Sequence, residues 1–180
     1  MSYSIVLVGM RGSGKSTIAE ILGKRLNLRV IDTDARNNYR PSSSSSKAFR
    51  DKESAVLKGI GTDIPTVIAT GGGTILRKEN RRRLRELGTV FCLTAPDSVL
   101  YDRIGEDPGR PLLTKASDMR EDLRNLAKRR TPLYREVADR TIATKGRRPI
   151  EVAEEIARIY RQGKQGSSPR RKLVAKLAAA

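Results

Sequence analysis

Short apolar runs alternate with amphipathic stretches along most of this 180-residue chain. The runs, which are short and rich in β-branched residues as strands are, occupy residues 5–8, 28–31, 65–70, 90–93 and 140–144. Apolar positions at helical spacing predict helices over residues 17–26, 47–57, 77–87, 118–130 and 149–161, and a short helix that ends at residue 103. Pro132 is expected to bend or restart the helix before it. Strands that alternate with helices through right-handed crossovers predict an α/β protein with a three-layer α/β/α sandwich.

Three segments interrupt this alternation. Residues 42–46 are consecutive serines after Pro41, a low-complexity run that cannot bury an apolar face. Residues 105–117 are rich in glycine, proline and charge and are expected to form a mobile loop. Residues 163–180 are expected to form a disordered basic tail, and the last five resemble an expression-vector scar. We therefore expect one domain over residues 1–162.

The composition is strongly basic. With 37 Lys and Arg, 20 Asp and Glu and no histidine, the formal net charge is +17. The lack of histidine excludes a His metal cluster and a Ser-His-Asp triad. Basic proteins can bind nucleic acid, but two Phe, five Tyr and no Trp are too few for base-stacking platforms, so small anions are the favoured ligands. The clustered Arg81, Arg82, Arg83 and Arg85 are interpreted as a solvated helix face.

Cysteine use and hydropathy bear on location. Cys92 is the single cysteine, so no disulfide can form within the chain, and a reducing cytoplasm fits best. Neither a secretory segment nor an apolar run long enough to cross a bilayer is present, so no membrane partner is expected. We expect a monomer.

The segment Gly9–Thr17 fits G-x-x-x-x-G-K-[ST] and lies between a predicted strand and a predicted helix. Its glycines and the following helix N-terminus form a cage of N–H groups for phosphates. Lys15 is suited to reach the β- and γ-phosphates of ATP, and Ser16 to bind Mg²⁺. The residues expected to contact the nucleotide are Gly12, Ser13, Gly14, Lys15, Ser16 and Thr17. The alternative is a glycine-rich turn without a ligand.

Two further polar groups follow predicted strands. Asp32 and Asp34 come directly after the second strand, and Gly71-Gly72-Gly73 follow the third. Ligands of an open parallel sheet gather at these carboxyl ends. The acids could instead cap the next segment, and the glycines could form a plain turn.

These residues and several later motifs resemble the shikimate kinase family, small P-loop kinases that phosphorylate the 3-hydroxyl of shikimate with ATP. The resemblance extends from about residue 4 to residue 161. Its motifs, in order, are Gly9–Ser16, Asp32-Thr33-Asp34, Phe49-Arg50 with Glu53, Gly71–Gly73, Arg110–Leu113 and Arg130–Tyr134. It implies a five-stranded parallel sheet of the nucleoside-monophosphate-kinase type, with a substrate-binding region over residues 35–60 and a lid over residues 105–117.

The resemblance implies roles on the acceptor side. Asp34 is expected to bind the substrate hydroxyls and take up the proton. Arg50 and Arg130 are expected to bind the substrate carboxylate, which suits guanidinium forks, with Glu53 holding Arg50 in place. Gly71, Gly72 and Gly73 are expected to let the substrate approach the backbone. Either arginine could instead be one more surface charge.

The resemblance also implies roles on the nucleotide side. Asp32 is expected to hold Mg²⁺ near Ser16. Arg110 in the lid is expected to act in catalysis with Lys15 and Asp34, and to close over the β- and γ-phosphates. Arg103 and Arg147 match the positions that flank adenine.

Between Asp34 and Phe49 this chain is shorter than the family pattern and largely serine. The segment is either a flexible variant of the pocket wall or a set of stand-in residues. Two alternatives to shikimate phosphorylation therefore stay open. One is a P-loop kinase for another small hydroxylated acid such as gluconate, and the other is a basic, nucleotide-regulated RNA-binding module.

Overall fold

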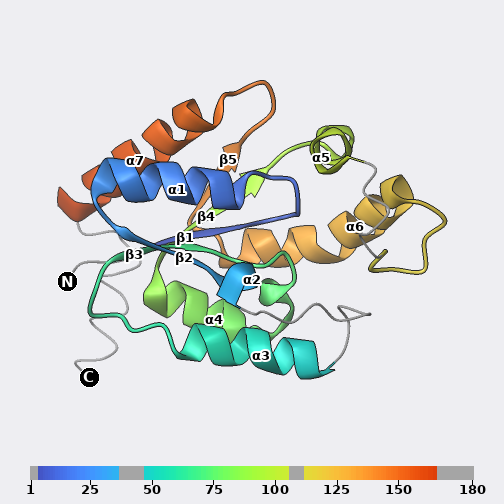
Figure 1. The fold of residues 1–180 in the computed structure, drawn as a ribbon, viewed down its shortest axis with the longest axis horizontal. Coiled ribbons are helices and arrows are strands. Elements are labelled where there is room, and N and C mark those ends of the chain that lie inside the picture. Colours follow the sequence, from blue (N-terminus) through green and yellow to red (C-terminus); the bar gives the residue numbers. More distant parts are fainter. Residues whose placement is uncertain (1–3, 37–46, 106–111, 166–180) are drawn as a thin grey trace.

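The computed structural model describes residues 4–36, 47–105 and 112–165, which form a five-stranded sheet between two layers of helices (Figure 1). Neighbouring strands all pair in parallel, in the order β2-β3-β1-β4-β5. The strands are β1 (Ser4–Gly9), β2 (Arg29–Asp32), β3 (Thr66–Ala69), β4 (Gly88–Thr94) and β5 (Arg140–Ala143). The predicted three-layer sandwich around a five-stranded parallel sheet is confirmed.

The central strand β1 is buried along its whole length. Ile5 and Leu7 face one apolar cluster, and Val6 and Val8 face the other, because successive side chains of a strand point to opposite faces. A strand covered on both faces needs apolar residues at every position, which explains the uninterrupted run in the sequence.

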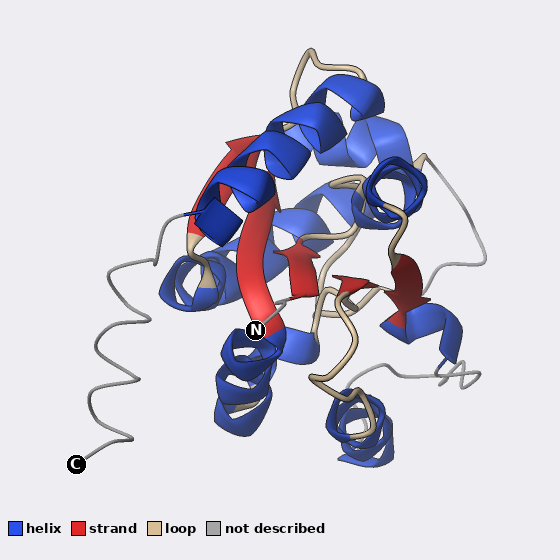
Figure 2. Ribbon diagram, turned by 90° about the vertical axis from the view of Figure 1, so that its left-hand side faces the viewer, coloured by secondary structure: helices blue, strands red, loops and turns tan. Residues whose placement is uncertain are grey.

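Helices cover both faces of the sheet, with α1 and α7 on one side and α3, α4 and α6 on the other (Figure 1). Figure 2 shows the same layers from the side, with the strands enclosed between helices. The helices are α1 (Lys15–Leu26), α2 (Thr33–Arg36), α3 (Lys47–Lys58), α4 (Lys78–Leu87), α5 (Asp97–Ile104), α6 (Met119–Val137) and α7 (Pro149–Gln165), with a 3₁₀ turn η1 (Thr74–Leu76). No helix in the described ranges is long and apolar enough to cross a membrane.

Some elements differ from expectation. The short helix α2 and the turn η1 were not predicted, and they follow the ends of β2 and β3. The helix α6 continues through Pro132 to Val137, so the helix does not restart there, and the expected bend stays a prediction. Proline removes one backbone donor, but Arg130 and Tyr134 on either side are both anchored to the carbonyl of Gly72, and these tertiary contacts favour the helix.

The arginines of α4 are not simply a solvated face. Arg81 donates to the carbonyl of Ile75 at 2.8 Å, and Arg83 donates to the carbonyl of Ile60. Arg82 and Arg85 are exposed, and Arg85 donates to the carbonyl of Glu136. Part of the basic charge on this helix therefore binds carbonyl groups at the ends of neighbouring segments. The serine run at 42–46, the loop residues 106–111 and the tail from residue 166 lie outside the described residues.

Candidate functional site

Three loops meet at one edge of the sheet, where the strands β1, β2 and β3 end. β3 lies between β2 and β1, so its glycine triplet, residues 71–73, lies between the acids Asp32 and Asp34 at the end of β2 and the phosphate loop, residues 9–17, at the end of β1. The carboxyl ends of the strands in an open parallel sheet are where ligands bind. The fold thus brings three motifs that are distant in sequence to one place.

The phosphate loop owes its shape to glycine. Gly12 and Gly14 have φ angles of 77° and 91°, in the left-handed region that glycine adopts without strain. A Cβ at Gly9 would overlap a backbone carbonyl of β4 and lie 2.9 Å from the buried Ser13 hydroxyl. The helix α1 begins at Lys15, so its first N–H groups face into the loop.

Lys15 is buried beneath this loop. Its Nζ donates to the carbonyls of Gly9 at 3.0 Å and Met10 at 2.9 Å. Burial lowers the pKa of this ammonium to about 8, although Asp34 and Asp32 act in the opposite direction. A cation that is poorly hydrated interacts strongly with an anion that enters the loop.

The hydroxyl of Ser16 and the carboxylate of Asp32 meet at the mouth of the loop, where Oγ donates to Oδ2 at 2.6 Å. The other carboxylate oxygen of Asp32 accepts from the N–H groups of Asp34 at 2.9 Å and Ala35 at 3.2 Å. Asp32 therefore caps α2 and contacts Ser16 at the same time. Ser16 and its neighbour Thr17 are exposed, and oxygen groups of this kind are the ligands that Mg²⁺ takes.

Asp34 lies on α2 with its carboxylate turned toward the glycine triplet. A Cβ at Gly71 would overlap Oδ1 of Asp34, although the residue as a whole stays exposed. Loss of water around the carboxylate, and then the nearby charge of Asp32, raise the pKa of Asp34, while Lys15 opposes this shift. A carboxylate with raised proton affinity at an open site can accept a proton from a ligand hydroxyl.

Arg50 reaches the same triplet from α3. Its Nη1 donates to Glu53 one turn further along the helix, and Glu53 also accepts from the hydroxyl of Thr74 at 3.1 Å. The expected pairing of Glu53 with Arg50 is therefore present. A Cβ at Gly73 would overlap the Arg50 guanidinium, so glycine makes room for this side chain.

Arg130 reaches the triplet from α6. Its Nη1 donates to the carbonyl of Gly72 at 3.1 Å, and the Tyr134 hydroxyl donates to the same carbonyl at 2.6 Å. Burial lowers the pKa of Arg130, because the guanidinium has lost much of its water. Arg50 and Arg130 thus place two cations beside one turn, an arrangement that suits a small carboxylate.

The three other arginines that were expected to contact the nucleotide differ in where they lie. Arg103, at the end of α5, donates to the carbonyl of Gly12 at 3.4 Å and to that of Thr144 at 2.8 Å, so it lies at the phosphate loop. Arg147 pairs with Glu155 of α7 at 2.6 Å. Arg110 lies outside the described residues.

Two residues at the site received no role from the sequence. Tyr134 belongs to the motif Arg130–Tyr134, and it shares the carbonyl partner of Arg130. Asp122, a fully buried carboxylate on α6, accepts from the Arg11 guanidinium of the phosphate loop. Nothing in the sequence near Asp122 distinguishes it from the other charged positions of that helix.

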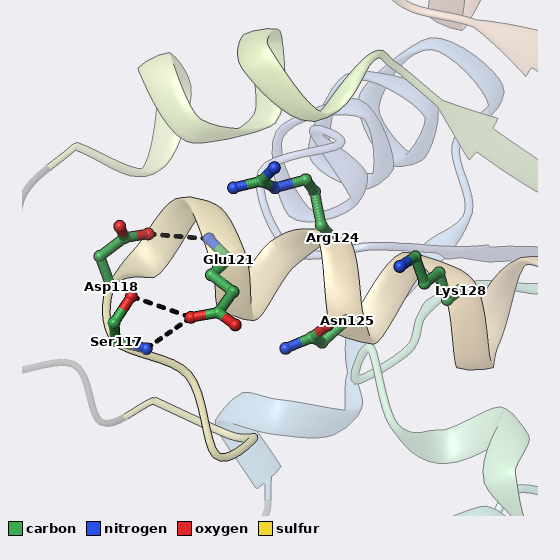
Figure 3. A pocket seen from close by; sticks show the side chains of 6 residues that line it. All are labelled: Ser117, Asp118, Glu121, Arg124, Asn125 and Lys128. Atoms are coloured by element: carbon green, nitrogen blue, oxygen red, sulfur yellow. Dashed lines mark hydrogen bonds between the residues drawn. The ribbon is translucent and has the colours of Figure 1, made fainter.

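A separate hollow lies along the first half of α6 and contains none of the predicted site residues (Figure 3). Its lining consists of Ser117, Asp118, Glu121, Arg124, Asn125 and Lys128. Asp118 caps the helix by accepting from the Glu121 N–H at 2.8 Å, and Ser117 donates to the Glu121 carboxylate. Its acidic groups therefore serve to start the helix, and we do not assign it to the site.

A phosphate-binding loop lies at the end of one strand, and a carboxylate and two guanidinium groups lie at the ends of the two neighbouring strands. This arrangement is typical of a P-loop kinase that acts on small molecules. Comparison with known proteins identifies the family within this class. The model of the shikimate kinase family matches residues 11–161. The chain belongs to the shikimate kinase family.

Individual relatives agree with this assignment. A shikimate kinase of Thermodesulfovibrio yellowstonii is 37% identical over 92% of this chain and 99% of its own length. One of Nitrosococcus oceani is 38% identical over 97% of this chain and 95% of its own. The solved structure of Acinetobacter baumannii shikimate kinase in complex with shikimate has a TM-score of 0.84 and 32% identity, and the match covers 92% of this chain and 97% of that one. A Sinorhizobium meliloti gluconokinase, at 19% identity and a TM-score of 0.57, shares the fold alone.

Proposed function

We propose that this protein transfers the γ-phosphoryl group of ATP to the 3-hydroxyl of shikimate. The observation that supports shikimate as the substrate is the pair of Arg50 and Arg130. Both side chains reach the glycine triplet, from two different helices and close to Asp34. A small acid with several hydroxyls can place its carboxylate between the guanidinium groups and a hydroxyl at the carboxylate. The Acinetobacter baumannii relative, solved in complex with shikimate, supports this choice.

The donor side follows from the phosphate loop. Lys15 and the N–H groups of the loop would bind the ATP phosphates, and Ser16 and Asp32 fit Mg²⁺ as oxygen ligands alongside phosphate oxygens and water. When bound, the ion neutralises phosphate charge. We assign adenine contacts to Arg103 and Arg147 and phosphate contacts to Arg110 by family resemblance alone.

The acceptor side needs a base. Asp34 would hold the 3-hydroxyl in line with the γ-phosphorus and take its proton as the new P–O bond forms and the bond to ADP breaks. The arginines fix the ring by its carboxylate, which turns one hydroxyl toward the donor. One chain supplies all of these residues, so we propose that a monomer is active, and its use of ATP suits a cytoplasmic location.

The decisive experiment measures ADP release by the purified full chain with Mg-ATP before and after shikimate is added. We expect release to depend on shikimate and to fail with an analogue that lacks the carboxylate. Each charged hydrogen bond to the carboxylate is worth about 1.5–3 kcal/mol, so Arg50→Ala and Arg130→Ala should raise the KM for shikimate by tenfold or more. Arg82→Ala, at an exposed arginine of α4, is the matched control and should leave the KM unchanged.

Two outcomes would contradict the substrate assignment in different ways. Turnover with gluconate and none with shikimate would keep the kinase chemistry and change the acceptor. Salt-sensitive retention of RNA that survives Lys15→Ala, with no turnover of either acid, would favour the nucleic-acid alternative.

A further inference from the structure

Asp122 joins three segments of the chain through one buried carboxylate. Its side chain is 0% exposed, and Oδ2 accepts from the guanidinium of Arg11 in the phosphate loop. Oδ1 accepts from the backbone N–H of Leu113 at 2.9 Å and of Thr114 at 2.7 Å. The phosphate loop, the chain ahead of α6 and α6 itself therefore share a single anchor.

The same helix also carries an acceptor-side residue. Asp122, Leu126, Arg130 and Tyr134 are spaced one turn apart and are all buried, so they form one stripe of α6. Eight residues of helix, from 122 to 130, span about 12 Å. One end of this span is attached to the phosphate loop through Arg11, and the other is attached to the glycine triplet through Arg130.

The phosphate loop and the triplet also lie close to each other. A Cβ at Gly72 would lie 3.6 Å from the backbone nitrogen of Arg11 and 3.3 Å from Nη1 of Arg130. The phosphate loop forms the donor half-site, and the triplet with the side chains around it forms the acceptor half-site. Because α6 is attached to both, a shift of α6 relative to the phosphate loop would change the distance between these half-sites. Phosphoryl transfer is sensitive to such a shift, because the attacking and leaving oxygens must stay in line.

We propose that Asp122 is a positioning residue for the reaction proposed above, which holds Arg11 and α6 so that the donor and acceptor half-sites keep their spacing. A fully buried carboxylate does not increase helix stability as such, since an apolar residue of similar size often serves the fold equally well. Its bond to Arg11 connects the phosphate loop on the donor side to α6, which carries Arg130 on the acceptor side. The two bonds from Leu113 and Thr114 attach the chain ahead of α6 to the same helix. Asp122 is fully buried, so it acts through Arg11 and the helix and not by contact with a substrate.

The test uses Asp122→Asn in the full chain. The amide keeps the size of the side chain and an oxygen for the N–H groups of Leu113 and Thr114, but it loses the charge that holds Arg11. We expect kcat to fall by about 10- to 100-fold, the effect of a small misplacement of reacting groups. The dissociation constants for ATP and for shikimate, each measured alone, should stay near wild type. The control is Asp118→Asn, the same substitution at the exposed cap of α6, which should leave kcat unchanged.

A double-mutant cycle identifies the partner. Arg11→Met should lower kcat by a similar factor, and the double variant should be no worse than either single variant, because both remove one contact. If Asp122→Asn does not fold, Arg11→Met is decisive, since that side chain is partly exposed: reduced kcat with intact binding supports the proposal, and normal kcat overturns it.

Other results overturn the inference outright. One is a normal kcat in Asp122→Asn. Another is a loss of affinity for ATP and for shikimate as large as the loss in kcat. A third is a loss of kcat in the double variant that equals the product of the two single losses. Wild-type protein that releases no ADP on addition of shikimate would instead refute the proposed function, and this inference with it. An active wild type with an equally active Asp122→Asn variant refutes the inference alone.

Discussion

Single residues of the site carry charges that have lost part of their water. Burial lowers the pKa of Lys15 and of Arg130, and it raises the pKa of Asp34. In each case burial makes the charged form less favourable. A bound anion stabilises the charged form of Lys15 or Arg130, and Asp34 gains affinity for the proton of a ligand hydroxyl. The protonation states of Lys15 and Asp34 therefore depend on whether the substrates are bound, whereas the guanidinium of Arg130 stays charged.

The affinity for ATP should fall as the pH rises above about 8, because free protein then loses the Lys15 proton that the bound phosphates require. Below that pH, Lys15 is protonated in both the free and the bound protein, and its contribution is constant. The loss should approach tenfold per pH unit, since one proton is taken up on binding. Calorimetric titration from about pH 7.5 to 9.5 measures it. Lys15→Arg is the control, because arginine stays charged throughout, and an affinity of the wild type that does not change with pH would be inconsistent with this account.

Asp34→Asn should lower kcat by about 10²–10⁴-fold while nucleotide affinity is retained, because the amide keeps the size of the side chain but cannot take the proton. In the wild type, kcat/KM should fall on the acid side at a higher pH than for an ordinary aspartate. The reason is that the pKa of Asp34 is raised, so the base is neutralised earlier as the pH falls. Steady-state kinetics over pH 4–8 test both points. Near-normal turnover of the variant would show that another group is the base.

At the scale of elements, the glycine triplet after β3 is a contact surface for side chains that arrive from three helices. Asp34 approaches Gly71 from α2, Arg130 approaches Gly72 from α6, and Arg50 approaches Gly73 from α3. Each glycine thus makes room for a different polar group. The triplet orders these groups more than it bends the chain, since Gly73 has an ordinary φ of −101°.

Gly73→Ala should leave the fold intact and raise the KM for shikimate more than it lowers kcat. The backbone at this position accepts alanine, but the new methyl group displaces the Arg50 guanidinium, which can move at little cost because it ends a flexible side chain. Thermal unfolding and steady-state kinetics separate the two effects. Gly61→Ala, where the nearest atom would lie 3.8 Å away, is the control. An unchanged KM would mean that Arg50 does not set the position of the substrate.

Local sequence patterns predicted some elements well and others poorly. The strand β1, the phosphate loop and the pairing of Arg50 with Glu53 depend on neighbours within a few positions, so their patterns are visible in the sequence. The link between Arg11 and Asp122 joins residues 111 positions apart, and no local pattern indicates it. The path of α6 through Pro132 likewise depends on contacts with β3's loop.

Over the whole molecule, the net charge of +17 is the property that sequence alone already gives. It does not determine the fold, but it creates a field that attracts anions such as ATP and shikimate. The structure shows which of the basic side chains lie at the site. Arg50, Arg103 and Arg130 lie at the site, whereas Arg81 and Arg83 of α4 bind carbonyl groups away from it.

Raising the salt concentration from about 0.1 M to 1 M should increase the KM for both anionic substrates while kcat changes less. The Debye length falls from roughly 10 Å to 3 Å, which screens the long-range field, whereas the buried charges of the site are screened much less. Steady-state kinetics with a non-ionic solute as the control for viscosity and water activity tests this. An equal effect of salt on kcat would point to the site charges themselves.

The position of β1 has a consequence for how the chain becomes functional during synthesis. This strand is made first, yet its two neighbours in the sheet come much later, because Ile5 pairs with Val67 and Ser4 with Gly88. A nascent chain therefore carries an apolar strand with at least one open side, and with the nucleotide loop at its end, until β4 has left the ribosome. Chains truncated before Gly88 should be substrates for chaperones and proteases, since one side of their first strand remains open.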